Sequence, residues 1–164
     1  IKPGAKYATD LTKNKKIGVL GTHATVNSKA YIHAIKDILP DAQIYQQACP
    51  LFVPLVEEAI IQGKVAETVV EETLKNIAKT GIDTVILGCT HYPVLKDLIE
   101  KYLPHVAVVD STHYIIEDIA KLNLKQDGKG LREVLVTDDT SAFLSLKNLL
   151  VGNIPVQVVE LTEK

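Results

Sequence analysis

A cysteine, a threonine and a histidine stand together at Cys89-Thr90-His91, directly after the apolar run 83–88 and shortly before Pro93. Pro93 predicts that a helix begins there, because proline is favoured in the first turn. Unpaired N–H groups at a helix start favour the thiolate form of a nearby cysteine. His91 can act as a proton partner of that thiol, and Thr90 offers a hydroxyl and an N–H suited to a carboxylate. The pattern favours a proton-transferring Cys89 over a merely buried strand-end cysteine.

A second polar turn follows the predicted strand that ends at Gly21. Hydroxyl groups at Thr22, Thr25 and Ser28 could bind a carboxylate or a phosphate at a helix start. Simple N-capping is the commoner role for any one of them. The turn has neither the Gly-x-Gly-x-x-Gly nor the P-loop pattern, so the sequence carries no nucleotide-binding fingerprint.

Three other candidate residues have plainer interpretations. Cys49 precedes a proline, and we expect it to be structural. A metal site made from Cys49 and Cys89 lacks the close ligand spacing of zinc sites, so we expect no metal there. Glu57 and Glu58 follow Pro54 in what the sequence predicts to be the first turns of a helix, where the helix dipole alone makes acidic residues common.

Short apolar runs alternate with helical patterns along the chain. The sequence predicts strands at 15–21, 43–49, 83–88, 106–110, 131–137 and 156–161. It predicts helices at 24–39, 54–61, 65–79, 111–123 and 140–150, with a further one from Pro93. This alternation requires right-handed crossovers and predicts an α/β fold with a mainly parallel sheet flanked by helices. Ligands of such sheets bind beyond the carboxyl ends of the strands, so we expect the Cys89 sulfur to lie at a cleft there.

The composition narrows the class of protein. Hydrophobic residues make up 46% of the 164 residues and charged residues 23%, an ordinary globular balance. No apolar run approaches the roughly 20 residues of a membrane helix. The net charge is −2 and the lysines are scattered, so the sequence shows no basic patch of the kind that binds nucleic acid. Two cysteines and no secretory signal indicate a cytoplasmic protein. The chain lacks methionine and opens on Ile1-Lys2-Pro3-Gly4, so we expect it to be part of a longer polypeptide.

Four stretches of the chain together resemble the glutamate racemases of the aspartate/glutamate racemase superfamily. They are Gly-Thr-x-Ala-Thr-x-x-Ser at 21–28, the central motif at 48–57, Leu-Gly-Cys-Thr-His-Tyr-Pro at 87–93, and a closing segment from Val136 through Phe143 to Val156. Asp139 stands where the closing segment usually has a proline. The resemblance covers essentially the whole chain.

The resemblance implies two α/β domains with the active site between them, the second domain being inserted into the first. Residues 15–110 would be the second domain, and residues 111–164 would return to complete the first. Such enzymes interconvert L- and D-glutamate for peptidoglycan synthesis without a cofactor. One cysteine thiolate removes the α-proton, and a second cysteine delivers a proton from the other face. Cys89 would be one of this pair; the Cys-Asn-Thr motif with the other, and an Asp-Ser motif, are absent here, so we expect the chain alone to be inactive.

The resemblance also implies a role for each site residue. Cys89, His91 and Glu57 would be catalytic, with Glu57 beside the histidine, and Thr90, His91, Thr25 and Thr22 would bind substrate. The implied partners are glutamate and, in the full-length enzyme, a second copy. Two alternatives stay open. Aspartate racemases share the two-cysteine plan but tend to have Glu where this chain has His91, and a non-catalytic α/β ligand-binding module would leave Cys89 merely buried.

Overall fold

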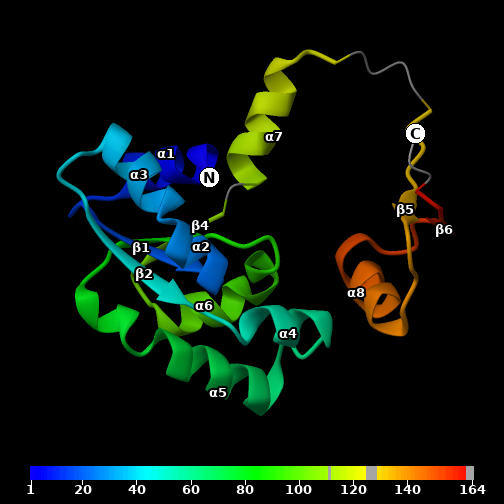
Figure 1. Cartoon of the computed structure of the whole chain (residues 1–164), viewed down its shortest axis with the longest axis horizontal. Coiled ribbons are helices and arrows are strands. Elements are labelled where there is room, and N and C mark those ends of the chain that lie inside the picture. Colours follow the sequence, from blue (N-terminus) through cyan, green and yellow to red (C-terminus); the bar gives the residue numbers. More distant parts are fainter. Residues whose placement is uncertain (111, 125–128, 162–164) are drawn as a thin grey trace.

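A four-stranded parallel sheet organises the larger part of the chain in the computed structural model, which describes residues 1–110, 112–124 and 129–161 (Figure 1). Its strands are β1 (Lys16–Gly21), β2 (Gln43–Ala48), β3 (Thr84–Leu87) and β4 (Ala107–Val109). They lie in the order β2-β1-β3-β4, and every neighbouring pair is parallel. The predicted α/β fold with a mainly parallel sheet is therefore confirmed.

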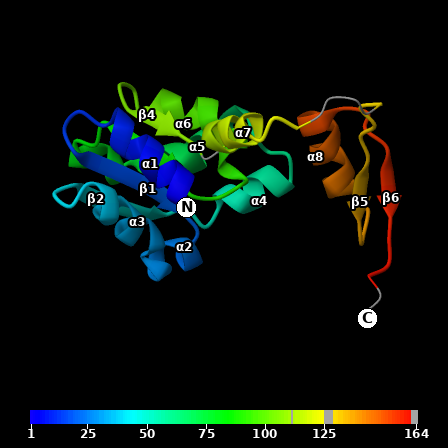
Figure 2. The same ribbon diagram turned by 90° about the horizontal axis from the view of Figure 1, so that it is seen from above.

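Helices cover both faces of this sheet (Figure 2). One face carries α1 (Lys2–Leu11) and α3 (Ala30–Ile38), and the other carries α5 (Gly63–Leu74), α6 (Lys96–Tyr102) and the 3₁₀ turns η1 (Ile77–Thr80) and η2 (Tyr92–Leu95). Successive strand side chains point to opposite faces, so Ile17 and Val19 pack with α1 and α3 while Leu20 packs on the other side. Two buried apolar layers thus hold the sheet at a fixed position.

Helix α1 is an element that the sequence patterns did not predict. Pro3 lies in its first turn, where a missing N–H costs no hydrogen bond. Ala5 and Ala8 are fully buried, and their small side chains let α1 approach α3 and the sheet closely. The packed unit around the sheet therefore includes residues 2–11 as well as the strands that follow.

A carboxylate at the start of β3 holds the loop that leads from α1 into β1. Asp83 accepts hydrogen bonds from the Thr12 hydroxyl (2.6 Å) and from the backbone N–H groups of Lys13 (2.7 Å) and Asn14 (2.8 Å). Burial raises the pKa of Asp83, but these hydrogen bonds outweigh it, and the net pKa lies below the usual range. Asp83 is therefore an ionised tether between two chain segments that are distant in the sequence.

We expect Asp83→Asn to lower the free energy of unfolding at pH 7 by about 1–3 kcal/mol. One carboxylate oxygen accepts from both backbone N–H groups and the other from the Thr12 hydroxyl, whereas an amide has a single acceptor oxygen and no charge. Since the folded-state pKa is depressed, this stabilisation is complete above the unfolded-state pKa of about 3.9 and is lost progressively as the pH falls through the lower folded-state pKa. Urea unfolding at pH 7 and at pH 3 measures this, and the difference between the two proteins should be smaller at pH 3. Asp37→Asn, at an exposed position, is the control. Equal stability of wild type and Asp83→Asn at pH 7 would contradict the tether.

The helix predicted at 24–39 is wrong as a single element. It is two helices, α2 (His23–Ser28) and α3, separated by Lys29, whose φ of 55° is left-handed. The Ser28 hydroxyl donates to the Thr25 carbonyl (2.8 Å) and accepts from the Ala30 N–H (3.3 Å), so it competes with the helical backbone at the break. The break gives Tyr31 a place in the first turn of α3, where it is buried.

The helix predicted at 65–79 ends at Leu74 and continues only as the 3₁₀ turn η1. Gly81 follows with a φ of 75°, the left-handed conformation expected of a glycine that ends a helix. Within the part of the chain that the structure describes, no helix is long and apolar enough to cross a membrane.

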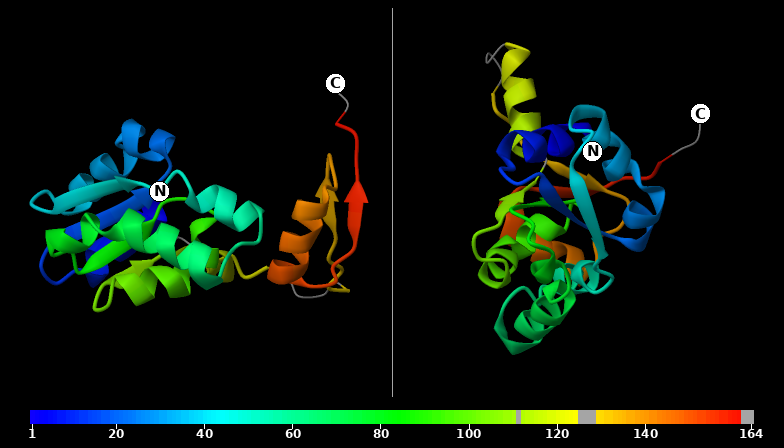
Figure 3. Two further views of the ribbon diagram at one scale, coloured as in Figure 1. Left: turned by 90° about the horizontal axis from the view of Figure 1, so that it is seen from below. Right: turned by 90° about the vertical axis from the view of Figure 1, so that its left-hand side faces the viewer.

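The last three elements, β5 (Val134–Val136), α8 (Ser141–Val151) and β6 (Val156–Val158), lie apart from the four-stranded sheet (Figures 1 and 3). Helix α7 (Thr112–Lys121), which precedes them, contacts α1. β5 does not join the main sheet; it pairs in parallel with β6. Helix α8 reaches back to α4, and Leu146 packs against the main core. Large apolar side chains stay exposed across this segment: Ile116, Ile119, Leu122, Leu124, Leu131, Leu135, Leu149, Leu150, Val158 and Leu161.

Candidate active site at the carboxyl edge of the sheet

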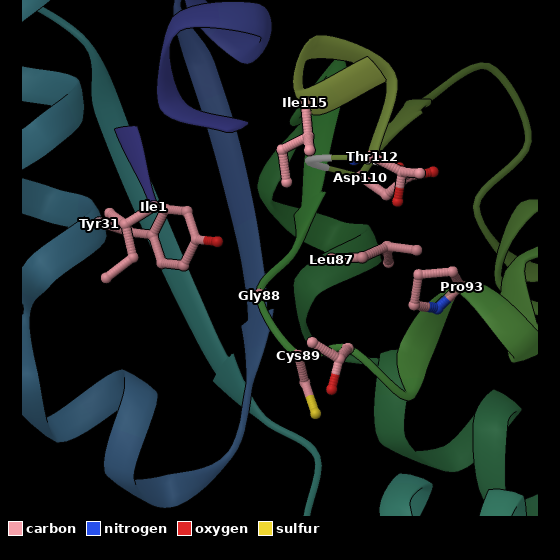
Figure 4. Close-up of a pocket in the computed structure, with 10 residues that line it drawn as sticks. Ile1, Tyr31, Leu87, Gly88, Cys89, Pro93, Asp110, Thr112 and Ile115 are labelled. Atoms are coloured by element: carbon pink, nitrogen blue, oxygen red, sulfur yellow. Dashed lines mark hydrogen bonds between the residues drawn. The ribbon is translucent and has the colours of Figure 1, made fainter. Parts of the chain in front are cut away.

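Because β1 to β4 are all parallel, the residues that follow them gather at one edge of the sheet. Cys89 lies two residues beyond the end of β3 and is partly buried. It lines a cavity of about 350 Å³, shown in Figure 4. The rest of the lining comes from Ile1, Tyr31, Leu87, Gly88, Thr90, Pro93, Asp110, Thr112 and Ile115. The prediction that Cys89 follows a parallel strand and lies at a cleft is confirmed.

The loop that carries Cys89 is tied to the loop after β2. No α-helix begins at Pro93, contrary to the prediction; Pro93 belongs to the 3₁₀ turn η2, and α6 starts only at Lys96. Tyr92 is fully buried, and its hydroxyl donates to the Cys49 carbonyl at 3.0 Å. Its ring meets that of Phe52 edge to face, with centroids 5.2 Å apart. These contacts bring the 89–91 turn beside α4 (Phe52–Glu57).

Cys89, His91 and Glu57 form a line of three groups. The Cys89 Sγ lies 3.8 Å from His91 Nδ1, and His91 Nε2 lies 3.4 Å from Glu57 Oε1. When Glu57 accepts from the Nε2–H, the Nδ1 lone pair is left to face the thiol. Thr90 Oγ1 is 3.5 Å from the same Nδ1. The Glu57 side chain is 57% exposed, so its pairing with His91 orients the ring more than it stabilises the fold.

Glu57 is not in the first turn of its helix, so the dipole explanation of this acid is wrong. Helix α4 begins at Phe52, and Pro54 is its third residue, where the missing N–H is not needed. Glu57 is the last residue of α4, and the partial negative charge of a helix C-terminus disfavours a carboxylate there. The contact with His91 is the interaction that accounts for this position.

The turn after β1 caps a helix, as the plainer interpretation expects. The Thr22 hydroxyl accepts from the Thr25 N–H at 3.2 Å, and the two hydroxyl oxygens lie 3.1 Å apart. Thr25 also reaches the turn of Cys89, because a Cβ added to Gly88 would lie 3.4 Å from the Thr25 methyl group. The structure thus places Thr22 and Thr25 at the same edge as Cys89, with their hydroxyls already paired to each other.

Cys49 has the properties of a structural cysteine. It is fully buried, and its Sγ lies 3.5 Å from the Gln47 carbonyl oxygen. Burial raises the pKa of the Cys49 thiol to about 12, so it does not exchange protons readily at neutral pH. Among the described residues, no three or more His, Cys, Asp or Glu side chains are grouped so as to hold a metal ion.

Three lining residues of the cavity were not singled out from the sequence. Asp110 and Thr112 follow β4, which is the neighbour of β3, and the rule that ligands bind beyond strand ends points to them. Tyr31 falls within the helix predicted at 24–39, and helical spacing of apolar residues carries no signal for a cavity. Its position depends on the break at Lys29.

Comparison with known proteins gives consistent matches. Residues 2–119 match the family model described as Asp/Glu/Hydantoin racemase. The chain is 48% identical over 163 residues to a glutamate racemase of Sulfurihydrogenibium, covering 99% of this chain and 63% of that relative. A glutamate racemase isoform of Bacillus anthracis superposes with a TM-score of 0.88 at 32% identity, over 98% of this chain and 63% of that one. A Francisella tularensis glutamate racemase in complex with D-glutamate superposes with a TM-score of 0.81 at 28% identity, over 96% and 61% of the two chains.

Proposed function

Since this chain belongs to the Asp/Glu/Hydantoin racemase family, we propose that it carries one half of the proton-transfer machinery of a glutamate racemase. The observation that supports this most directly is the line of Cys89, which lines the cavity, His91 and Glu57. A thiol next to an imidazole whose far nitrogen meets a carboxylate is suited to exchange protons near neutral pH.

In the proposed reaction, the Cys89 thiolate removes the α-proton from one face of the amino acid. The Cα–H bond breaks, its electron pair stays on Cα, and the proton moves to sulfur. In the opposite direction the Cys89 thiol delivers its proton to the same face of Cα. Inversion needs a second acid on the other face. To form the thiolate, the Cys89 thiol gives its proton to His91 Nδ1, and the Nδ1–H of the resulting imidazolium then faces the sulfur. Glu57, by accepting from the Nε2–H, leaves Nδ1 free to take that proton.

The second proton-transferring group comes from outside these 164 residues. The only other cysteine, Cys49, is buried with a raised pKa. The chain spans 63% of the length of the Sulfurihydrogenibium relative, so that relative has a further segment. We propose that such a segment supplies the second cysteine, that 15–110 with α1 form one domain, and that 111–164 complete the other. The exposed apolar side chains of β5, α8 and β6 support this, because a complete α/β unit buries such side chains.

The substrate that fits this proposal is glutamate. The Francisella relative, 28% identical, was crystallised with D-glutamate. Thr90 and His91 would hold it beside Cys89, and Thr25 and Thr22 would complete the site at the end of β1. A cytoplasmic homodimer that serves peptidoglycan synthesis is the setting we propose for the complete enzyme.

Isotope exchange tests the proposed function. A hybrid protein joins the segment of the Sulfurihydrogenibium relative that this chain does not span, which the family resemblance places upstream, to residue 1 of the chain. Incubated in deuterated water, the hybrid should invert L- and D-glutamate with exchange of the α-proton and leave aspartate unchanged, whereas the chain alone should do neither. Inversion by the chain alone would overturn the two-group scheme, and exchange of aspartate in preference to glutamate would reassign the substrate.

We expect Glu57→Gln in the hybrid to lower kcat for glutamate by about tenfold. A glutamine oxygen still accepts from the His91 Nε2–H, but without the charge that stabilises the imidazolium, a difference worth about 1–2 kcal/mol. Glu58→Gln is the matched control, since Glu58 is the neighbouring acid and has no contact with His91 among those the structure describes. Equal losses in the two variants would mean that general charge at the cleft, and not the contact with His91, is responsible.

A further inference from the structure

Tyr31 is a buried residue that lines the cavity, and its hydroxyl has no hydrogen-bond partner among the residues that the structure describes. Only 4% of the residue is exposed, and none of the described residues hydrogen-bonds its phenol oxygen. Buried tyrosine hydroxyls usually have such a partner. The side chain lines the same cavity as Cys89, and Figure 4 shows its oxygen pointing from α3 toward the segment that carries Gly88.

The ring of Tyr31 lies against the backbone next to Cys89. A Cβ placed on Gly88 would be 3.0 Å from Tyr31 Cε2, so the glycine leaves room for the phenol. Other polar side chains of the cavity already have partners: Asp110 accepts from the Thr112 N–H at 2.7 Å, and Thr90 Oγ1 lies 3.5 Å from His91 Nδ1. Tyr31 therefore has an unused hydrogen-bond donor in the cavity that Cys89 also lines.

The electrostatics keep this hydroxyl protonated. Burial raises the pKa of Tyr31, and the negative charge of a Cys89 thiolate raises it further. The phenol therefore remains a donor while Cys89 acts as a base. A donor that faces a cavity of about 350 Å³, a size typical of small-ligand pockets, suits an anionic oxygen of a bound molecule.

We propose that Tyr31 is a substrate-binding residue whose hydroxyl donates a hydrogen bond to a carboxylate oxygen of the amino acid bound beside Cys89. This inference rests on the proposed function, because it takes an amino acid as the occupant of the cavity. In this role the phenol depends on the helix break at Lys29, because the break starts α3 at Ala30 and so places Tyr31 in its first turn, at the site.

Tyr31→Phe in the hybrid tests the inference, because phenylalanine keeps the ring against Gly88 and removes only the donor. We expect KM for glutamate to rise about 10- to 100-fold, the range for a lost hydrogen bond to a charged group, with kcat changed less than about threefold and with an unchanged Tm. Tyr45→Phe is the control, because the Tyr45 hydroxyl donates to Gln43 on β2, away from the cavity.

An unchanged KM in Tyr31→Phe would overturn the inference. If the pH midpoint for alkylation of Cys89 were also higher in that variant, the Tyr31 hydroxyl would be assigned as a donor to the Cys89 thiolate instead of to the substrate. If the hybrid itself fails to exchange the α-proton, the proposed function fails separately. Protection of Cys89 from iodoacetamide by glutamate then still tests the role of Tyr31, since protection needs binding alone. Protection that is lost in Tyr31→Phe supports the inference. Absence of protection in the unsubstituted hybrid contradicts it.

Discussion

Cys89→Ser in the hybrid should lower kcat for racemisation of glutamate by about 10³-fold in both directions. A serine hydroxyl is a far weaker acid than a thiol, so at neutral pH it is neither a ready base nor a ready proton donor. General acid–base groups contribute about 10²- to 10⁴-fold, which sets the expected loss. Polarimetry from each pure enantiomer measures it. Cys49→Ala is the control, because Cys49 is buried and structural, and it should lower stability while kcat stays within a few-fold.

The loss in Cys89→Ser should also be unequal between enantiomers of an analogue that carries a leaving group. Elimination needs only one base, so the second group of the hybrid still acts on the enantiomer whose α-proton it faces. Following chloride release from both enantiomers of a β-chloro amino acid separates the two half-reactions. Equal residual elimination from both would show that Cys89 is not the base for one face, and the assignment would have to be abandoned.

The site residues that could be predicted from the sequence are reactive or polar residues that stand next to one another in the chain. Cys89, Thr90 and His91 are adjacent, so a strand ending before them suffices to place them at the carboxyl edge of the sheet. The contact between His91 and Glu57 could not be predicted in this way. It depends on the packing of Tyr92 against Phe52, which joins two loops that are distant in the sequence, and hydrophobic periodicity gives no information on such a contact. Glu57 was assigned from the family resemblance, and its position along α4 was misjudged.

The errors in the fold have local physical causes. Two helices were predicted to begin at Pro54 and Pro93, but Pro54 lies third in α4 and Pro93 lies in a 3₁₀ turn. Both positions tolerate a missing N–H, so proline marks the first turn and not its first residue. The break at Lys29 comes from a serine hydroxyl that bonds to the backbone, which hydrophobic periodicity does not register. The strands were easier, because burial on both faces demands the continuous apolar runs that the sequence shows.

The narrowest steric fit in the site is at Gly88. A Cβ at this position would lie 2.8 Å from the Leu20 carbonyl oxygen and 3.0 Å from the Tyr31 ring. The Gly88 N–H also donates to that carbonyl at 2.7 Å, extending the ladder between β1 and β3 past the end of β3. Because the first obstacle is backbone, no change of rotamer relieves the clash. The chain must shift, and Cys89 is the next residue.

We therefore expect Gly88→Ala in the hybrid to lower the free energy of unfolding by about 1–3 kcal/mol, as overpacking does. It should also lower kcat/KM for glutamate by about 10²-fold, since a displacement of about 1 Å at a reacting group has an effect of that size. Gly18→Ala is the matched control. Its Cβ would meet the end of the Ile82 side chain at 2.7 Å, in the core on β1 and away from the cavity, and that methyl group can move aside. Gly18→Ala should lose stability with little loss of kcat/KM. If Gly88→Ala shows the same pattern, the cleft tolerates movement of Cys89, and the fit around Gly88 serves folding alone.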